Sequence, residues 1–283
     1  MRRYLIAMLA AGAVASAQPA RADQWDRSFT VSGAATLSMQ TYDGRVLVHT
    51  WDKPQVDVRV TTKGWRIGTQ VRVTAEQNGD DIHITVTKPH FQFSITWDRY
   101  AIQVEVWMPR TGKLEARSGD GPVSVEDFAG RLDVTTSDGA IAVTGFQGNA
   151  VLHTSDGEIH ASGMDGTLDA STRDGRIRAQ GRFDVLRLRT GDGPIVAQAD
   201  AGSKVASDWS LHTSDGSLTL RVPPGIDADL DAHTGDGRIT VDLPVEVSGS
   251  MSRSRLHGRL GKGGGHLEMV TGDGSIVVER AAI

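Results

Sequence analysis

One dipeptide, Asp-Gly, returns along the chain in nearly the same local phrase, and this recurrence limits the folds that the sequence can adopt. The phrase reads TSDGAIAV from Thr136 to Val143 and TSDGEIHA from Thr154 to Ala161. Nine copies occur, and the glycines from Gly121 to Gly193 follow one another at a strict interval of eighteen residues. A fixed period of this kind is typical of a solenoid, in which each repeat forms one coil stacked on the last.

Within each period, apolar residues alternate with polar residues on both sides of the Asp-Gly pair. Leu132, Val134 and Thr136 precede one pair, and Ile141 and Val143 follow it. Alternation with a period of two indicates strands with one buried face and one solvent face. We therefore predict an all-β fold, a parallel β-solenoid (β-helix) with 18-residue coils about 4.8 Å apart, preceded by a β-rich N-terminal cap section.

The Asp-Gly pairs predict a sharp turn at the same place in every coil. Glycine adopts positive φ without steric cost, and an aspartate can accept a hydrogen bond from nearby amides in an Asx-turn. The threonines two residues ahead of the aspartates are expected to line the inside of the corner, namely Thr136, Thr154, Thr172 and Thr190. This structural turn ladder consists of Asp120, Gly121, Asp138, Gly139, Asp156, Gly157, Asp174, Gly175, Asp192, Gly193, Asp215, Gly216, Asp236, Gly237, Asp273 and Gly274.

The first 22 residues predict a signal peptide. Arg2 and Arg3 precede an apolar run from Leu5 to Ala17, and small residues follow at 20–22. The alternative is a single anchoring helix, for which the run is short against the ~20 residues that a span requires. We expect an exported protein, periplasmic, cell-surface or extracellular, with no transmembrane span after signal cleavage.

Two further sections follow the signal peptide. Residues 23–117 are predicted to form the β-rich N-terminal section, and residues 118–283 the Asp-Gly solenoid with an insertion at about 244–266. The last repeat is expected to lie at the terminal edge of the stack. Five of the six tryptophans lie in the N-terminal section and are expected to pack in its core, with sugar-stacking platforms as the alternative: Trp25, Trp51, Trp65, Trp97 and Trp107.

Charge and cysteine content exclude several classes of function. The net charge is −5 and no basic stripe is present, which argues against a nucleic-acid partner. The absence of cysteine excludes thiol nucleophiles, zinc-thiolate sites and iron–sulfur clusters. No arrangement of residues indicates a catalytic, cofactor-binding or metal site, so we expect none of these.

Three groups of residues remain as candidate sites. The stacked aspartates are expected to be turn residues, with bound calcium as the alternative cofactor, because stacked carboxylates repel one another. His153, His212 and His233 occupy equivalent outward positions, with His212 and His233 as possible neighbours, and are expected to be solvated. A local run of basic residues is expected to belong to a flexible surface insertion, with a patch for an anionic ligand as the alternative; it consists of Arg253, Arg255, Arg259 and Lys262.

These phrases resemble the bacterial DUF4097 family of β-strand repeat proteins. The resemblance rests on the repeated T-S/G-D-G-x-I-x-V phrase and on the ending GRLGKGGGHLEMVTGDGSIVV from Gly258 to Val278, and it covers residues 23–283. It implies a β-solenoid of the cell envelope, adhesin-like in name, with no established enzyme chemistry and no site residues to carry over.

The sequence therefore predicts an exported, non-enzymatic β-solenoid with a binding or scaffolding role in the envelope. Its partner is an unknown ligand, a glycan or another envelope component. Two alternatives stay open. One is a carbohydrate-active parallel β-helix enzyme using outward acids such as Asp133, Asp169 or Glu158. The other is an envelope-stress or membrane-associated sensor module.

Overall fold

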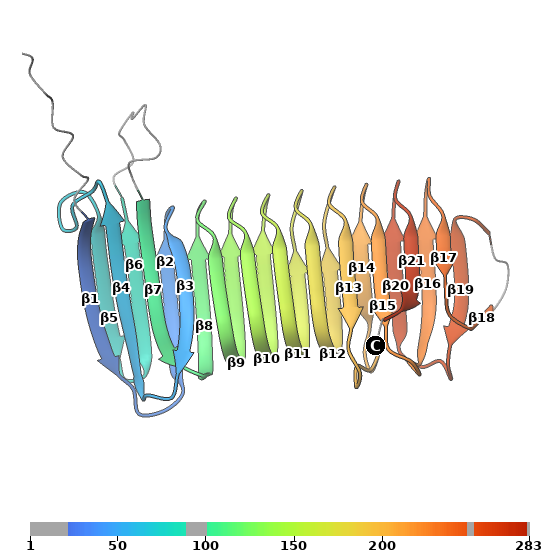
Figure 1. Cartoon of the computed structure of the whole chain (residues 1–283), viewed down its shortest axis with the longest axis horizontal. Helices are drawn as coiled ribbons and strands as arrows, with labels where there is room; N and C mark the ends of the chain where they lie inside the picture. The colour runs from blue at the N-terminus through green and yellow to red at the C-terminus, as the bar shows by residue number, and fades with distance from the viewer. Residues whose placement is uncertain (1–21, 89–100, 248–251, 282–283) are drawn as a thin grey trace, which may run out of the picture.

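The computed structural model describes residues 22–88, 101–247 and 252–281, and these form an elongated stack of strands (Figure 1). The described residues contain 21 strands and no helix. The predicted all-β solenoid is confirmed. Nearly all of the predicted signal segment, residues 1–21, and Trp97 lie outside the described residues.

Four long strands form the regular centre of the stack. They are β9 (Val123–Thr136), β10 (Ile141–Thr154), β11 (Ile159–Ser171) and β12 (Ile177–Arg189). Each pairs in parallel with the next, and Ile141 has Val123 on one side and Ile159 on the other, so one coil takes eighteen residues as predicted. Each long strand contains both of the alternations that the sequence shows, joined through a bend.

That bend is the place where positive φ is needed. Gly130, Gly148 and Gly166 occupy equivalent positions on three successive coils, with φ of 118°, 126° and 131°. Only glycine adopts such angles readily. The bend turns each strand around a core whose apolar side chains stack coil on coil, and the rings of Phe128 and Phe146 lie 6.2 Å apart.

The N-terminal end closes the stack with antiparallel strands. β1 (Ala22–Thr30) pairs with β4 (Gln55–Lys63), β4 with β7 (Ala101–Pro109), and β5 (Arg72–Asn78) with β6 (Asp81–Thr87), all antiparallel. The parallel ladder resumes with β2 (Ala35–Thr41) between β6 and β8 (Thr111–Ser118), and with β3 (Arg45–Trp51) between β7 and β9. Antiparallel strands at an end remove the open parallel edge on which another chain could pair.

The C-terminal end consists of shorter strands. These are β13 (Ile195–Ala199), β14 (Trp209–Thr213), β15 (Leu218–Val222), β16 (Ala228–Thr234), β17 (Ile239–Val241), β18 (Val245–Val247), β19 (Arg255–Leu260), β20 (His266–Thr271) and β21 (Ile276–Arg280). β19 pairs antiparallel with both β16 and β18. The expected insertion at 244–266 therefore contains a terminal strand pair as well as connecting segments.

The spatial order of the coils departs from the chain order at both ends. β21 lies between β15 and β17, and β20 lies between β14 and β16, so the last repeat in the sequence is inserted before the coil of Asp236. The expectation that the last repeat lies at the terminal edge is wrong. At the other end, the turn of Asp43 stacks directly on that of Asp120, and the described part of the N-terminal section thus contributes a coil to the ladder.

This inserted order predicts that Ile276→Ala destabilises the protein by about 1–2 kcal/mol more than Ile239→Ala. Ile276 is fully buried between Leu218 and Ile239. Among the described strands β17 pairs only with β21, and on its other side Ile239 has a single backbone hydrogen bond to Arg253. Urea unfolding of the two variants measures the difference in unfolding free energy. A larger loss for Ile239→Ala is what a stack in chain order would give, and it would contradict the inserted arrangement.

Candidate functional site

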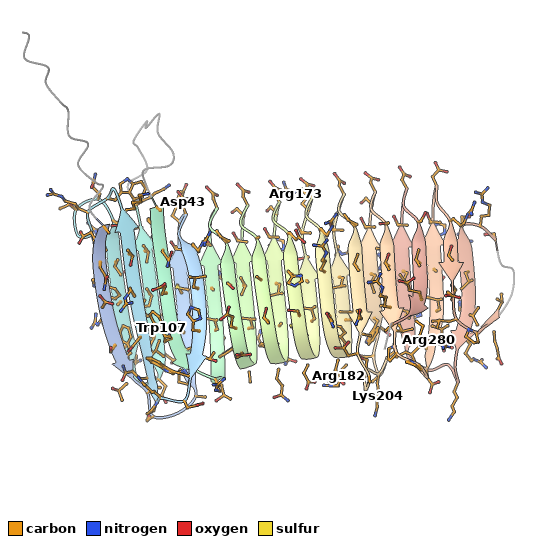
Figure 2. The ribbon with its side chains drawn as sticks, viewed as in Figure 1. Asp43, Trp107, Arg173, Arg182, Lys204 and Arg280 are labelled. Atoms are coloured by element: carbon orange, nitrogen blue, oxygen red, sulfur yellow. The ribbon has the colours of Figure 1, made fainter. Side chains whose placement is uncertain are left out.

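The Asp-Gly turns form a continuous ridge along one edge of the solenoid. Their backbone contacts place the aspartates in the spatial order Asp43, Asp120, Asp138, Asp156, Asp174, Asp192, Asp215, Asp273 and Asp236. All of them are exposed except Asp43, which is half-buried and forms an ion pair with Lys88. In Figure 2, Asp43 and Arg173 lie along this edge of the stack. We call this row of turns the turn ridge.

Close stacking, and not positive φ, explains the glycine of each turn. None of the Asp-Gly glycines has positive φ, so the conformational reason expected from the sequence is wrong. A Cβ added at Gly157 would lie well inside 3.0 Å of the carbonyl oxygen of Gly139 on the coil before it, and the same holds at Gly139 and Gly175. The turn needs glycine because there is no room for a side chain between one coil and the next.

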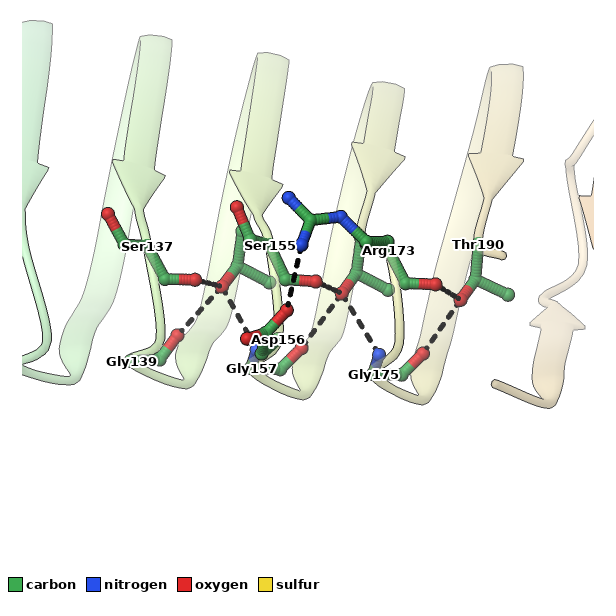
Figure 3. A network of polar contacts seen from close by, with 10 residues as sticks. Ser137, Gly139, Ser155, Asp156, Gly157, Arg173, Gly175 and Thr190 are labelled. Atoms are coloured by element: carbon green, nitrogen blue, oxygen red, sulfur yellow. Dashed lines mark hydrogen bonds and ion pairs between the residues drawn. The ribbon is translucent and has the colours of Figure 1, made fainter. Parts of the chain in front are cut away.

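Threonine hydroxyls hold the corner together, as Figure 3 shows for the turns from Ser137 to Thr190. The Thr154 hydroxyl lies 3.1 Å from the carbonyl oxygens of both Ser137 and Gly139, and it accepts a hydrogen bond of 3.1 Å from the Gly157 amide. One fully buried oxygen thus links two coils and closes its own turn. The predicted threonine ladder is confirmed.

The aspartates do not have the hydrogen bonds of the expected Asx-turn. In the described residues, no backbone amide donates to the carboxylates of the ridge, because threonine accepts from the turn glycine and the preceding coil's carbonyls bind the neighbouring amides. Asp156 has an ion contact of 3.7 Å with Arg173. No group of three or more histidine or acidic side chains in the described ranges is arranged to hold a metal ion.

The predicted basic patch lies on a strand and not on a flexible loop. Arg255 and Arg259 are exposed side chains of β19, whereas Arg253 lies two residues before the strand and Lys262 two residues after it. The guanidinium of Arg259 lies 3.8 Å from Asp229 and 3.9 Å from a carboxylate oxygen of Glu246. Part of the positive charge is therefore neutralised within the protein.

The three outward histidines have separate partners. His153 contacts the Ser171 hydroxyl at 2.9 Å, His212 contacts the Glu268 carboxylate at 3.0 Å, and His233 contacts the Ser254 carbonyl oxygen at 3.1 Å. β20 lies between β14 and β16, so His212 and His233 are not on adjacent coils. The idea that they are neighbours is wrong.

A groove of about 390 Å³ lies on the outer wall of the N-terminal end, where β1, β4, β7 and β3 pair side by side. Directly opposed positions place Ser28, Asp57, Trp107 and His49 in one row across these four strands. Figure 2 shows Trp107 in this section. We call it the tryptophan groove, and its lining consists of Asp26, Arg27, Ser28, Trp51, Asp57, Val58, Arg59 and Trp107.

The tryptophans divide between the core and the outer wall. Trp25 and Trp65 pack against the core, and Trp209 is fully buried, which agrees with the packing role expected for most of them. Trp51 and Trp107 instead point outward, because they alternate with the inward-facing Thr50 and Met108. The alternation of residues along this strand could have predicted the outward direction of Trp107, because Trp107 lies on the same strand face as the polar residues at 103 and 105.

Fold and turn chemistry together define a capped parallel β-solenoid built from Asp-Gly repeats. The chain belongs to the Toastrack DUF4097 family, whose sequence profile matches residues 34–279. The matched range includes all nine Asp-Gly turns, so the resemblance predicted from the repeats is confirmed. No curated protein matches the chain.

Three solved structures illustrate the similarity in fold. A Parabacteroides distasonis protein named "putative lipid binding protein" is 12% identical with a TM-score of 0.46, and a Bacteroides fragilis "putative adhesin" is 9% identical with a TM-score of 0.43; each comparison covers 90% of this chain and 96% of the other. A Clostridium sporogenes "putative cell adhesion protein" is 11% identical with a TM-score of 0.33, covering 92% and 100%. Likeness at this level says nothing about ligands.

The described part of the chain contains no helix with the length and hydropathy that a membrane span requires.

The close approach at the ridge predicts that Gly157→Ala destabilises the protein by about 2 kcal/mol or more, because the new methyl group would push two coils apart. The matched control is Ser137→Ala, which changes an exposed turn side chain while keeping the carbonyl that Thr154 contacts, and we expect it to change stability by less than about 0.5 kcal/mol. Chemical denaturation measures both. Equal stability of the two variants would contradict the steric explanation.

The carboxylates of the ridge predict a stability change that depends on salt. Asp138 lies between Asp120 and Asp156 at the ~4.8 Å spacing of parallel strands, so Asp138→Asn removes two repulsions and should raise Tm by about 1 °C at 10 mM NaCl and by nothing measurable at 1 M. Asp156→Asn also loses its contact with Arg173 and should gain less. A fall of several degrees for Asp138→Asn at both salt concentrations would instead indicate a carboxylate that the turn, or a bound cation, requires.

Proposed function

We propose that this protein is an exported, non-enzymatic binding protein of the cell envelope, which holds a polymeric or repetitive ligand along the outer faces of its solenoid. The proposal rests above all on the repetition of the central coils. In β9 to β11 the same strand positions recur at each step of eighteen residues, and β12 keeps this interval except at its bend, where the register shifts opposite residues 164–166. The outward side chains of these strands form rows about 4.8 Å apart. Extended repetitive surfaces are how solenoids recognise partners.

Two further observations support this function. The exposed aspartates of the turn ridge give one edge a row of like charges, which suits a ligand that also repeats. The N-terminal segment from Met1 to Ala22 has the composition of a signal peptide, which supports export.

The length of the ligand provides the test. A ligand that lies along many coils should bind more tightly as its chain grows, because each added unit finds a further equivalent position at high effective concentration. The purified protein would be sedimented with peptidoglycan sacculi and with lipopolysaccharide, and its affinity for each polymer compared with that for short fragments of the same polymer. We expect at least about tenfold tighter binding of the polymer.

The same samples distinguish binding from turnover. New reducing ends or other cleavage products would contradict the non-enzymatic assignment and favour the carbohydrate-active alternative. Equal affinity for polymer and fragment would contradict binding along the repeated faces, and no binding to either polymer would contradict these envelope components as ligands.

A further inference from the structure

The tryptophan groove combines an aromatic surface with fixed polar groups in a volume suited to a small ligand. Its volume of about 390 Å³ falls in the ~300–1,000 Å³ range of small-molecule sites. Two half-buried indoles, Trp51 and Trp107, line it together with the carboxylates of Asp26 and Asp57 and the hydroxyl of Ser28. Flat apolar rings beside hydrogen-bonding groups match the two kinds of surface on a sugar ring, its C–H face and its hydroxyl rim.

Both indoles are held in place before any ligand arrives. The Trp51 indole N–H donates a hydrogen bond of 2.8 Å to the carbonyl oxygen of Gln55. Trp107 stacks with the His49 ring at 5.9 Å and an interplanar angle of 28°, and the Arg59 guanidinium lies 5.4 Å from the Trp107 ring centre. Groups fixed in this way lose little conformational entropy when a ligand binds.

The charges of the groove favour a neutral ligand. Asp26 and Arg59 form an ion pair of 2.8 Å, and hydrogen bonds from Gln24 and then Arg59 lower the pKa of Asp26, which keeps it ionised. Asp57 accepts a hydrogen bond of 2.5 Å from Gln55 and adds a carboxylate that disfavours an anion. A cationic ligand would compete with Arg59, which lines the groove and covers Trp107. Lys53 lies 4.4 Å from the Trp51 ring but does not line the groove, so a ligand in the groove would contact the side of this indole away from Lys53.

We propose that the tryptophan groove binds a neutral hexopyranose unit of a glycan, with a sugar C–H face against the Trp51 indole and sugar hydroxyls donating to Asp57. This inference rests on the binding function proposed above and deepens it by naming a ligand class and one defined site. The groove lies at one end of the solenoid wall, so the rest of a bound glycan can continue along the neighbouring coils.

Titration calorimetry with neutral hexasaccharides tests the proposal. The probes are cellohexaose, maltohexaose, mannohexaose and chitohexaose, with an oligogalacturonate as the anionic comparison. We expect at least one neutral probe to bind, with affinity reduced at least about tenfold in Trp51→Ala and several-fold in Asp57→Asn. Asp57→Asn preserves the shape of the side chain, so it keeps the test valid should Trp51→Ala fail to fold.

Two matched variants provide the controls. Tyr42→Ala removes an exposed aromatic ring, and Asp242→Asn neutralises an exposed carboxylate just after β17, at the opposite end of the solenoid. Both residues lie outside the groove, and both variants should bind as the wild type does. Equal affinity of the wild type and both groove variants would overturn the groove as the site while leaving the proposed binding function in place. Preference for the oligogalacturonate, or binding of no neutral probe, would overturn the neutral sugar, and sedimentation with envelope polymers would still decide the wider function.

Discussion

The structure depends on the contact between one Asp-Gly turn and the next. Parallel hydrogen bonding sets the distance between coils, and at that distance no side chain fits at the turn glycine, as the approach of Gly157 to Gly139 shows. The threonine hydroxyl then satisfies polar backbone groups that would otherwise be buried without partners. Each corner therefore requires both residues: glycine provides the space, and threonine provides the hydrogen bonds.

This corner also explains how the chain can change the order of its coils. All the turns present the same glycine carbonyl, and all present a threonine hydroxyl except that of Asp120, where the Ser118 hydroxyl takes its place. The turns alone therefore do not fix which coil stacks on which. The coil of Asp273 fits between those of Asp215 and Asp236 with the same contacts as in the regular centre, including the hydroxyl of Thr271 at 2.8 Å from the carbonyl oxygen of Gly216. Insertion places the last repeat between two neighbours, which protects it from fraying.

The sequence predicts the repeat but not the connections at its ends. Alternation and the eighteen-residue interval identify the buried leucines, the corner threonines and the coil length, because these depend on local periodicity alone. Coil order does not follow from them, since the phrases at Asp236 and Asp273 are nearly identical and nothing in either selects its neighbour. The sequence also did not indicate which glycines adopt positive φ. These are Gly130, Gly148 and Gly166 at the bend, and not the glycines of the Asp-Gly pairs.

A repeated outer wall requires similar residues in successive coils, whereas a defined pocket requires residues that differ from the repeat. Coils with the same backbone repeat each strand position many times, which suits a polymer but does not single out one sugar. The tryptophan groove arises where antiparallel pairing of β1, β4 and β7 interrupts the repeat and brings Trp107, Asp57 and Ser28 into one row. The sequence could predict that the side chains of Trp51 and Trp107 face outward, because each alternates with inward-facing residues. It could not predict that the two tryptophans line the same groove, because β3 pairs with β7 only when the coils adopt this non-sequential order. The arrangement that closes the solenoid at this end therefore also creates an irregular surface, on which we propose that a glycan is held.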